Sequence, residues 1–535
     1  MTQLGLPERL NAAVELVDSH LPAGRGGKPA ILCGDRTVTY QELCTCVNRL
    51  GNVLRALDVR MEERVVILLP DTPEWAFAFF AAMKIGAVAV PLNTNLKADD
   101  YEYLLNDSRA RVLVVDESLL GQIAGIRSQF LRHVLVRGKA DDAEPRQQSL
   151  ERVLQDASPE LAPADTGKDD TAFWLYSSGT TGRPKGAMHL HHDMLVAADC
   201  YARDTLALQE SDVSFSVAKL FFAYGLGNGL YFSLRVGATT VLLPDRPTPE
   251  KVFATIDRYQ PTVFYSVPTS YAALLHTAEK AGRTSLGRVR MCVSAGEPLP
   301  SHVFDKWRER FGVEILDGIG STEILHIFIS NRPGAALPGS TGQVVPGFEA
   351  KIVDDHGNTL PPREVGTLMI KGDSTATGYW NKHEATKNTF CGQWINTHDK
   401  FLMDEDGYFW YAGRTDDMFK VSGQAVWPTD VEGVLMQHEA VLESGVVGAL
   451  DTDGLVKPVA FVVLKEEHQP TPALASELQD FVKTHAAPHK YPRAVVFVES
   501  LHKTTTGKIK RYRLRELAGE LTPLHTQKGP EPKSP

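Results

Sequence analysis

The sequence is poor in cysteine and has no recognisable zinc pattern. Six cysteines occur among 535 residues, at positions 33, 44, 46, 200, 292 and 391. They are dispersed and contain no Cys-x-x-Cys pair, so free thiols are expected rather than a disulfide framework. Cys44 and Cys46, and the cluster of His189, His191 and His192, also lack the spacing of zinc ligands.

Export and membrane signals are also lacking. Residues 1–21 carry four charged side chains and no uninterrupted apolar centre, so they do not read as a signal peptide. The most apolar stretch, residues 75–92, is interrupted by Lys84 and ends at Pro91. It predicts a buried helix followed by a strand rather than a membrane span. We expect a cytoplasmic protein with no membrane partner.

The net charge and the absence of one motif argue against two further classes of protein. The formal net charge of −10 argues against a general nucleic-acid binder. No Gly-x-x-x-x-Gly-Lys-[Ser/Thr] string occurs, so a Walker-type ATPase is not predicted. A chain of 535 residues with 43% hydrophobic content exceeds a single core, and two or more domains are expected.

A phosphate-binding loop is the most informative feature present. Tyr176-Ser-Ser-Gly-Thr-Thr-Gly-Arg-Pro-Lys-Gly186 follows the apolar run 172–175, which predicts a buried strand. Its glycines permit close backbone approach, and its hydroxyls and lysine can donate to an anion. A surface turn of small residues is the alternative. The residues expected to contact phosphate are Ser177, Ser178, Gly179, Thr180, Thr181, Gly182 and Lys185.

Alternating strand-like and helix-like runs predict an α/β fold with mostly parallel sheets. The strand-like runs include residues 65–69, 112–115 and 239–243, and they alternate with helix-like stretches that include 73–85 and 251–259.

The pattern of predicted elements changes after about residue 354. Short strands and turns then predict a small β-rich subdomain. A polar turn at residues 413–417 predicts a domain boundary, and residues 521–535 are expected to be disordered.

The loop string resembles the signature of the adenylate-forming superfamily, which includes acyl-CoA synthetases and luciferases. Five further segments match in the expected order, from about residue 28 to about residue 516. The resemblance implies a large N-terminal adenylation domain of layered α/β sheets over residues 1–415, including the β-rich subdomain. It also implies a small mobile α+β C-terminal domain over residues 416–520.

Two segments resemble the superfamily's nucleotide-binding elements. Residues 294–299 resemble the turn that contacts adenine, and residues 317–323 the segment that holds the base and the α-phosphate. A Gly-rich loop that ends in a helix N-cap is the alternative for the second segment. The ATP contacts implied are Gly296, Glu297, Pro298, Asp317, Gly318, Ile319, Gly320, Ser321 and Thr322. The resemblance also makes Glu323 the ligand of Mg²⁺, a cation that prefers oxygen.

Later motifs imply the remaining catalytic parts. Asp399 and Arg414 match ribose or phosphate contacts, although His398 replaces a common glycine. Asp416 matches the hinge of the C-terminal domain, and Lys508 matches the catalytic lysine, although His502 replaces a common proline.

The implied reaction has two halves. A substrate carboxylate attacks the α-phosphorus of magnesium-bound ATP, with charge stabilised by Lys185, Thr322, Glu323 through its metal, and Lys508. The C-terminal domain then rotates, and Lys420, Ser422 and Gly423 line the tunnel for coenzyme A. The same arm on a carrier protein is the alternative acceptor.

The acid specificity is indicated by residues 219–228 and 325–328, which resemble benzoate-CoA ligases. The resemblance implies a flat pocket for an aromatic ring, although by composition the same side chains are equally suited to a core. No acidic residue occurs in the region 222–224 to pair with a substrate ammonium group, which disfavours free amino acids. The implied pocket residues are Phe222, Ala223, Tyr224, Gly320, His326 and Ile327.

The sequence thus predicts an AMP-forming benzoate-CoA ligase of aromatic compound degradation that acts as a monomer or homodimer. The alternatives are a ligase for hydroxybenzoate, aminobenzoate or a medium-chain acid, a degenerate non-catalytic acyl- or nucleotide-binding protein, and an oxygen-dependent luciferase.

Overall fold

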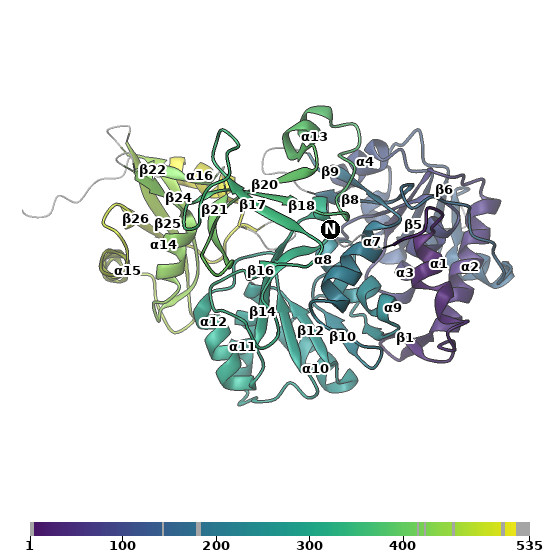
Figure 1. Cartoon of the computed structure of the whole chain (residues 1–535), viewed down its shortest axis with the longest axis horizontal. Coiled ribbons are helices and arrows are strands. Elements are labelled where there is room, and N and C mark those ends of the chain that lie inside the picture. Colours follow the sequence, from purple (N-terminus) through teal and green to yellow (C-terminus); the bar gives the residue numbers. More distant parts are fainter. Residues whose placement is uncertain are drawn as a thin grey trace, which may run out of the picture. The chain divides into compact units, whose positions relative to one another are not determined.

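The computed structural model describes residues 5–141, 144–177, 183–414, 417–421, 424–451, 455–503 and 509–520 (Figure 1). The chain divides into two compact units. The first comprises Met1–Ala350 and Met369–Thr397, and the second comprises Lys351–Leu368 and His398–Pro535. The predicted boundary at residues 415 and 416 falls on residues outside the described ranges and stays a prediction.

A seven-stranded sheet lies in the first unit, in the order β7-β6-β5-β3-β4-β8-β9. All its pairs are parallel except β8 with β9. The strands predicted at 65–69 and 112–115 are β3 and β5. The bounds are β3 Arg64–Leu68, β4 Val88–Pro91, β5 Val112–Asp116, β6 His133–Arg137, β7 Gln147–Ser149, β8 Thr171–Ser177 and β9 Lys185–Leu190.

The apolar stretch after residue 75 is a buried helix followed by a strand, as predicted. Helix α3 (Pro73–Lys84) is buried along its whole length, including its charged ends. The Lys84 ammonium lies 2.6 Å from Asp18, and Glu74 lies 2.6 Å from Arg36. These ion pairs offset the free-energy cost of removing the two charges from water. No helix among the described residues is long and apolar enough to cross a membrane.

A nine-stranded sheet forms the other half of the first unit, in the order β16-β15-β14-β13-β12-β10-β11-β1-β2. The pairs from β1 through β14 along this order are parallel, and β2, β15 and β16 are antiparallel additions at the edges. The bounds are β1 Pro29–Cys33, β2 Arg36–Thr39, β10 Val213–Ser216, β11 Thr239–Val241, β12 Val263–Ser266, β13 Met291–Ser294, β14 Ile315–Gly320, β15 Ile327–Ser330 and β16 Gln343–Val344.

Helices complete the α/β layering of the first unit. The predicted helices at 73–85 and 251–259 are α3 and α10. The remaining bounds are α1 Ala12–Leu16, α2 Tyr40–Ala56, α4 Ala98–Asp107, α5 Leu120–Ile123, α6 Leu150–Asp156, α7 Asp193–Ala197, α8 Ala223–Leu226, α9 Phe232–Val236, α10 Pro249–Tyr259, α11 Pro268–Lys280, α12 Ser301–Phe311 and α13 His383–Thr389. All six cysteines are free thiols, as expected.

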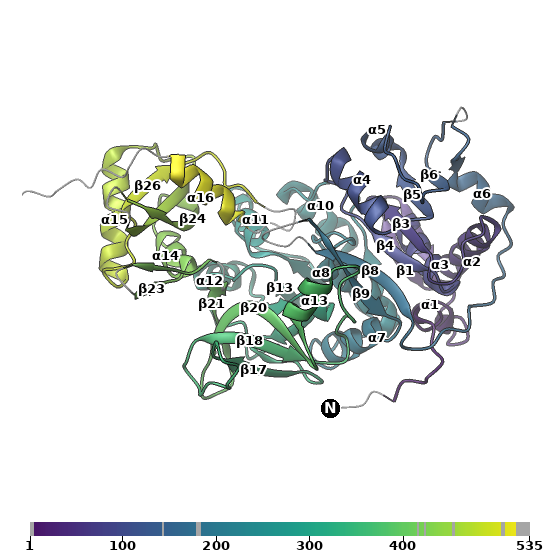
Figure 2. The same ribbon diagram turned by 90° about the horizontal axis from the view of Figure 1, so that it is seen from above.

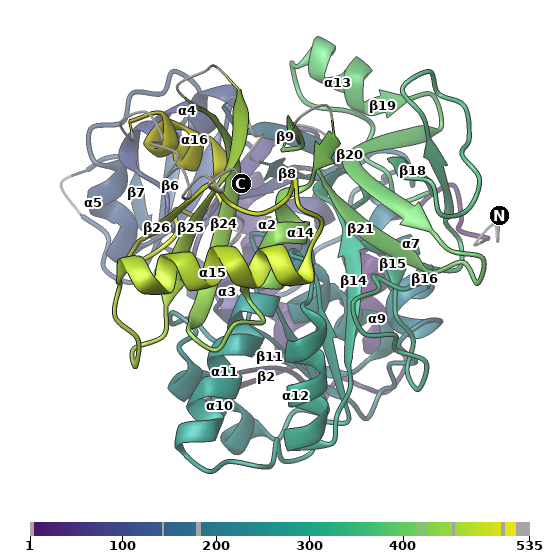
Figure 3. The ribbon, with the colours of Figure 1, turned by 90° about the vertical axis from the view of Figure 1, so that its left-hand side faces the viewer.

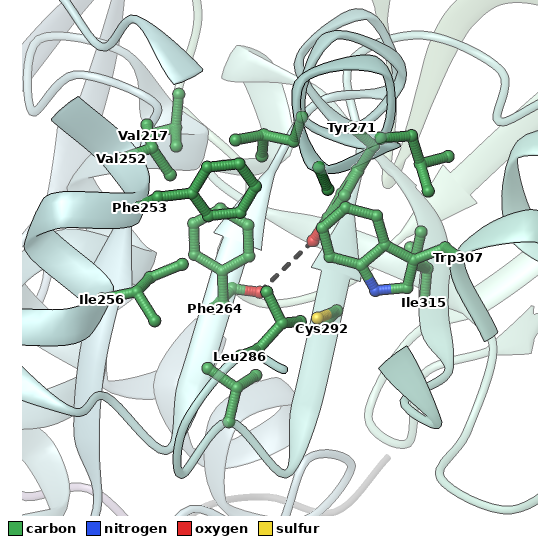
Figure 4. Close-up of a cluster of buried hydrophobic side chains, with 14 of the residues drawn as sticks. Val217, Val252, Phe253, Ile256, Phe264, Tyr271, Leu286, Cys292, Trp307 and Ile315 are labelled. Atoms are coloured by element: carbon green, nitrogen blue, oxygen red, sulfur yellow. Dashed lines mark hydrogen bonds between the residues drawn. The ribbon is translucent and has the colours of Figure 1, made fainter. Parts of the chain in front are cut away.

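An aromatic cluster packs helices α10, α11 and α12 onto the nine-stranded sheet (Figure 4). Trp307 of α12 is fully buried and meets the ring of Tyr271 edge-on at 4.7 Å. The Tyr271 hydroxyl donates to the carbonyl of Phe264 at 3.4 Å, the contact drawn in Figure 4, and to that of Val293 at 2.8 Å. The cluster packs against β12, β13 and β14, and predicted site residues lie at the carboxyl ends of β13 and β14.

The β-rich region expected from about residue 354 is a five-stranded sheet, in the order β17-β18-β20-β19 with β21 paired to β20. The division between the two units passes through its strands. The bounds are β17 Glu349–Val353, β18 Gly366–Lys371, β19 Phe390–Cys391, β20 Trp394–Met403 and β21 Phe409–Arg414.

An α+β core lies in the second unit, as predicted. The sheet β24-β25-β26 has two apolar faces, because neighbouring strand residues point in opposite directions. Val446 and Val462 pack with helices α14 and α15, whereas Val447 and Phe461 pack with α16. Figures 2 and 3 show α15 along one face and α16 along the other. The bounds are β22 Phe419–Val421, β23 Gln424–Val426, α14 Pro428–Leu435, β24 Val441–Leu450, β25 Val456–Leu464, α15 Pro472–His485, β26 Ala494–Phe497 and α16 Arg511–Glu520.

The aromatic cluster predicts a large cost for truncating Trp307. We expect Trp307→Ala to lower the free energy of unfolding by ~3–5 kcal/mol, because it removes buried surface and leaves a cavity. Urea unfolding followed by circular dichroism measures the change. Leu337→Ala, at a side chain that is 38% exposed, should change it by about 0.5 kcal/mol or less. Similar values for both variants would contradict this packing role.

Candidate active site

The two ends of the predicted phosphate loop are held together by strand pairing. Ser177 ends β8 and lies opposite Lys185, which begins β9, in the antiparallel register of the two strands. The hairpin therefore brings a hydroxyl and an ammonium group to the same sheet edge. The loop residues between them, Ser178, Gly179, Thr180, Thr181 and Gly182, lie outside the described residues.

The carboxylate of Glu323 lies beside both ends of this hairpin. Its Oε1 accepts a hydrogen bond from the Ser177 hydroxyl at 3.3 Å and one from the Tyr379 hydroxyl at 2.6 Å. The Lys185 ammonium lies 4.5 Å from the centroid of the Tyr379 ring, within cation–π range. The structure thus brings together Ser177 and Glu323, which lie 146 positions apart in the sequence.

Tyr379 is a site residue that the sequence reasoning missed. Its segment pairs with β9, since the Trp380 N–H donates to the Gly186 carbonyl at 2.9 Å and the Met188 N–H to the Gly378 carbonyl at 3.0 Å. The pairing sets the ring beneath Lys185. A tyrosine that follows a glycine carries no spacing that separates it from an ordinary core tyrosine, so only the fold identifies it.

The predicted nucleotide segment is a strand end, not a Gly-rich loop. Gly318 and Gly320 belong to β14, which pairs antiparallel with β15. A Cβ at position 320 would lie 2.5 Å from the His326 carbonyl, and one at position 318 would lie 2.8 Å from that of Ile329. The glycines are therefore required for this close pairing. A single 3-10 turn, η5 (Thr322–Ile324), follows without a side-chain cap from Ser321.

Asp317 is a buried acid at this edge. Burial raises the pKa of its carboxyl to about 8. Its Oδ1 is enclosed without a hydrogen-bond partner among the described residues. At neutral pH the carboxyl is therefore mainly protonated, and the residue can donate as well as accept a hydrogen bond.

The predicted adenine turn leaves the neighbouring parallel strand. Ser294 of β13 lies opposite Asp317 of β14, so residues 296–298 and 318–320 emerge at the same sheet edge. Gly296 has a φ of 96°, a conformation that favours glycine. Glu297 accepts a hydrogen bond from the Thr269 hydroxyl at 2.6 Å. Carboxyl ends of adjacent parallel strands are a common place for a nucleotide.

His326 bounds the predicted aryl pocket and is a neutral imidazole. Burial lowers the pKa of His326 to about 3, and its Nε2 donates to the Tyr224 carbonyl at 3.2 Å. Nδ1 is therefore the unprotonated nitrogen, and it has no hydrogen-bond partner among the described residues. A Cβ at Gly227 would lie 2.5 Å from the imidazole Cδ2, so only glycine leaves room for this ring.

The other predicted pocket residues lie at the start of α8 and in β15. Phe222, Ala223 and Tyr224 are partly exposed, and Ile327 is buried. The ring of Tyr224 lies 5.6 Å from that of His326, and the ring of the fully buried Tyr201 lies at the same distance. Tyr224 therefore brings an aromatic ring next to His326, whose carbonyl faces Gly320.

The second unit places the predicted ribose contacts opposite each other. Asp399 of β20 and Arg414 of β21 are paired in register, and their side chains lie 3.6 Å apart. His398 has a φ of 59°, which explains why the superfamily commonly has glycine there; histidine is among the residues that tolerate this region. Lys420 is exposed in β22. The predicted hinge Asp416, the tunnel residues Ser422 and Gly423, and Lys508 lie outside the described residues.

The chemistry of the Glu323 site fits a cation that takes one ligand from the protein and the others from water and substrate phosphates. Among the described residues, no group of three or more His, Cys, Asp or Glu side chains could hold a metal ion. Both hydrogen bonds to the Glu323 carboxylate within the described structure involve Oε1, and the residue is partly exposed. One carboxylate together with substrate phosphates and water is a usual environment for Mg²⁺.

The chain belongs to the AMP-binding enzyme family. That family matches residues 19–380, and the AMP-binding enzyme C-terminal domain matches residues 430–508. The chain is 48% identical to the benzoate-CoA ligase of Thauera aromatica, over 95% of this chain and 96% of that protein. It is 45% identical to a 4-hydroxybenzoate-CoA/benzoate-CoA ligase of Rhodopseudomonas palustris, over 95% and 94% respectively.

Solved structures of aryl-CoA ligases have the same fold. An anthranilate CoA ligase in complex with anthranoyl-AMP is 42% identical with a TM-score of 0.92, and the match covers 97% of this chain and 99% of that chain. A benzoate CoA ligase from Burkholderia xenovorans is 45% identical with a TM-score of 0.87, covering 95% of this chain and 100% of that chain. The adenylate-forming fold expected from the sequence is therefore confirmed.

The raised pKa of Asp317 predicts a pH-dependent contribution to stability. The carboxyl holds its proton to about pH 8 when folded but only to about 3.8 when unfolded. The contribution of this carboxyl to the free energy of unfolding is therefore fully present below pH 3.8 and is lost as the pH rises to about 8. Asp317→Asn cannot ionise, so its Tm should rise relative to that of the native protein between pH 5 and 8. A Tm difference that does not vary with pH would contradict this assignment.

Proposed function

We propose that this protein is an AMP-forming aryl-CoA ligase. It converts benzoate or a small substituted benzoate, ATP and coenzyme A into the aryl-CoA thioester, AMP and pyrophosphate. The observation that carries the proposal is the grouping of Ser177, Lys185, Glu323 and Tyr379, in which Glu323 follows β14, the strand that also borders His326. The relatives and solved structures described above support the choice of an aryl acid.

The first half-reaction forms an acyl adenylate. The substrate carboxylate attacks the α-phosphorus of ATP, the bond to the pyrophosphate oxygen breaks, and pyrophosphate leaves. No enzyme nucleophile is needed. Lys185 and Thr322 are proposed to bind the phosphates near the end of β14, and Lys508 to add positive charge from the C-terminal domain. Fixed donors of this kind stabilise the charge that develops in the transition state.

Magnesium would be held by Glu323, whose carboxylate Tyr379 and Ser177 orient through Oε1. When bound, the ion would neutralise phosphate charge. The residues of this chain contribute by fixing the direction of the carboxylate. Asp399 and Arg414 are proposed to bind the ribose hydroxyls, since a carboxylate suits two adjacent hydroxyls.

The second half-reaction transfers the acyl group to the thiol of coenzyme A. The thiol attacks the carbonyl carbon of the adenylate, and AMP leaves. Rotation about Asp416 is proposed to withdraw Lys508 and to present Lys420, Ser422 and Gly423 to the coenzyme A tunnel. The residue after the hinge is firmly held, because Asp417 lies 3.2 Å from the buried Arg511 guanidinium.

Arg511 in turn makes a two-point contact with Glu432, at 2.6 and 3.0 Å. Burial would lower the pKa of Arg511, but Glu432 and Asp417 raise it overall, so the guanidinium stays charged. Position 417 is therefore fixed to α14 and α16 of the second unit. A rotation axis at residue 416 agrees with this anchoring, since a few residues can absorb such a motion.

The aryl pocket is the basis for the proposed substrate class. Phe222 and Tyr224 present aromatic surface, and His326 is neutral, so nothing in this set pairs with a second charge on the acid. A flat apolar ring meets these surfaces favourably. We propose that the protein works in the cytoplasm as a monomer or homodimer, without a nucleic-acid or membrane partner.

The proposal is tested by acid-dependent conversion of ATP to AMP. The purified protein is assayed with benzoate, hydroxybenzoates, aminobenzoates, cinnamate, hexanoate and amino acids, each with and without coenzyme A. We expect AMP and thioester with benzoate or a small substituted benzoate. Turnover with hexanoate alone would discard the aryl pocket but keep an acid-CoA ligase. No turnover with any acid would favour a non-catalytic binding protein.

The hydrogen bond to Glu323 predicts the effect of removing one hydroxyl. Tyr379→Phe keeps the ring beneath Lys185 but loses the 2.6 Å bond to Glu323. We expect the rate of benzoyl-adenylate formation to fall about 10- to 100-fold, the range for a hydrogen bond to a charged group. Pyrophosphate release in single-turnover experiments measures this rate.

Tyr40→Phe is the matched control for this variant. It removes a buried tyrosine hydrogen bond of 2.6 Å to the Ala238 carbonyl, in a different part of the first unit. It should reduce stability without slowing adenylate formation. An unchanged rate in Tyr379→Phe, or an equal loss in Tyr40→Phe, would contradict the role assigned to Tyr379.

A further inference from the structure

A buried histidine connects strand β9 to the turn that carries Glu323. The His189 ring is completely buried and lies parallel to the ring of Phe173, with centroids 5.0 Å apart. Its Nδ1 lies 2.8 Å from Oδ2 of Asp193, which is also completely buried. Its Nε2 lies 2.8 Å from the backbone carbonyl oxygen of Thr322.

The hydrogen bond between His189 and Thr322 has a fixed direction. A backbone carbonyl can only accept a hydrogen bond, so Nε2 of His189 donates to the Thr322 carbonyl. Nδ1 faces the Asp193 carboxyl, and this second contact fixes the orientation of the ring. A nonpolar enclosure strengthens such hydrogen bonds relative to water.

The Asp193 carboxyl is held mainly through one of its two oxygens. The Leu190 N–H donates to Oδ2 at 3.1 Å, whereas Oδ1 lies 3.2 Å from Nε2 of His192 and makes no hydrogen bond among the described residues. His192 itself has a backbone carbonyl at 2.9 Å from each ring nitrogen, those of Lys168 and Asp373. Asp193 thus lies between two histidines that both face hydrogen-bond acceptors.

His191 provides an internal contrast. Burial lowers the pKa of His191 to about 4, and its Nδ1 accepts a hydrogen bond from the Ala12 N–H at 3.1 Å. A neutral imidazole satisfies that arrangement. Two buried histidines, two positions apart in sequence, therefore have opposite hydrogen-bond requirements, and only His189 contacts the Thr322 turn within the described structure.

The turn that His189 contacts is fixed at three successive carbonyls. His189 binds that of Thr322, the Ala376 N–H binds that of Glu323 at 2.8 Å, and the Ser374 hydroxyl binds that of Ile324 at 2.8 Å. The next residue, Leu325, has a φ of 74°, which is unfavourable for a leucine. Such a backbone persists only where its neighbours hold it in place.

We propose that the buried, hydrogen-bonded His189–Asp193 pair is the positioning device for the Thr322–Glu323 turn, holding it in the geometry that binds MgATP. This inference rests on the function proposed above. His189 is a positioning residue, since it reaches the nucleotide site through the Thr322 backbone. Asp193 acts one step further away, by holding the ring so that Nε2 faces the Thr322 carbonyl.

Two amide substitutions separate the two contacts of His189. In His189→Asn the amide nitrogen can occupy the place of Nδ1 and keep the contact with Asp193, but nothing reaches Thr322. In His189→Gln the longer side chain can place its amide nitrogen near the position of Nε2 and donate to the Thr322 carbonyl. Both variants lose the ring stacked on Phe173, so packing losses are matched.

The first readout is amide hydrogen exchange of the ligand-free protein over residues 318–330. We expect exchange to be faster in His189→Asn than in His189→Gln. The second readout is the dissociation constant for MgATP, measured by calorimetry without any carboxylic acid. We expect it to rise about tenfold in His189→Asn, and by clearly less in His189→Gln. Asp193→Asn should resemble His189→Asn, because an amide oxygen that accepts from the Leu190 N–H also draws the ring proton to Nδ1 and leaves Nε2 without a proton to donate to Thr322.

His191→Asn is the control, since it alters a buried histidine without touching the turn. It should leave the MgATP dissociation constant unchanged. Equal exchange and equal MgATP binding in His189→Asn and His189→Gln would overturn the positioning role while leaving the proposed function intact. So would a native MgATP affinity in Asp193→Asn. Failure of the native protein to bind MgATP would instead overturn the proposed function together with this inference.

Discussion

The orientation of one carboxylate, that of Glu323, is the constraint on which the account of this site depends. A hard cation and a triphosphate need an oxygen ligand at a fixed place, and a single exposed glutamate on a free loop would not supply one. Here the side chain is held by Tyr379 and Ser177, and the backbone on either side is held by hydrogen bonds to three successive carbonyls. The site is thus built from contacts between distant segments.

These contacts form between the β8–β9 hairpin of the seven-stranded sheet and the turn that follows β14 of the nine-stranded sheet. The β8–β9 hairpin ends in Ser177 and Lys185, and β9 also carries His189 and pairs with the segment of Tyr379. The close pairing of β14 with β15 needs glycine at position 320 and brings His326 beside the same edge. The turn that carries Glu323 and the His326 side chain therefore lie between the same two strands, β14 and β15.

The sequence was informative about elements and about motif residues. Apolar runs identified β3, β5 and α3. Lys84, which interrupts the apolar stretch of α3, favoured a buried helix over a membrane span, and in the structure its charge is paired with Asp18. Tyr379 and the His189–Asp193 pair could not be predicted in the same way. Their roles depend on neighbours far away in the chain, and no local spacing distinguishes them from core residues. For His398, the sequence showed that a histidine replaces the common glycine but not why glycine is common there. The positive φ of this residue in the structure gives the reason.

The most direct test of the account is a crystal structure of the protein with ATP and Mn²⁺ in place of Mg²⁺, using the anomalous signal to locate the metal. The account predicts a peak about 2.2 Å from a carboxylate oxygen of Glu323, with Tyr379 still bound to Oε1 and the α-phosphate near Thr322 and Lys185. A metal bound away from Glu323, or a nucleotide that does not approach the end of β14, would contradict it.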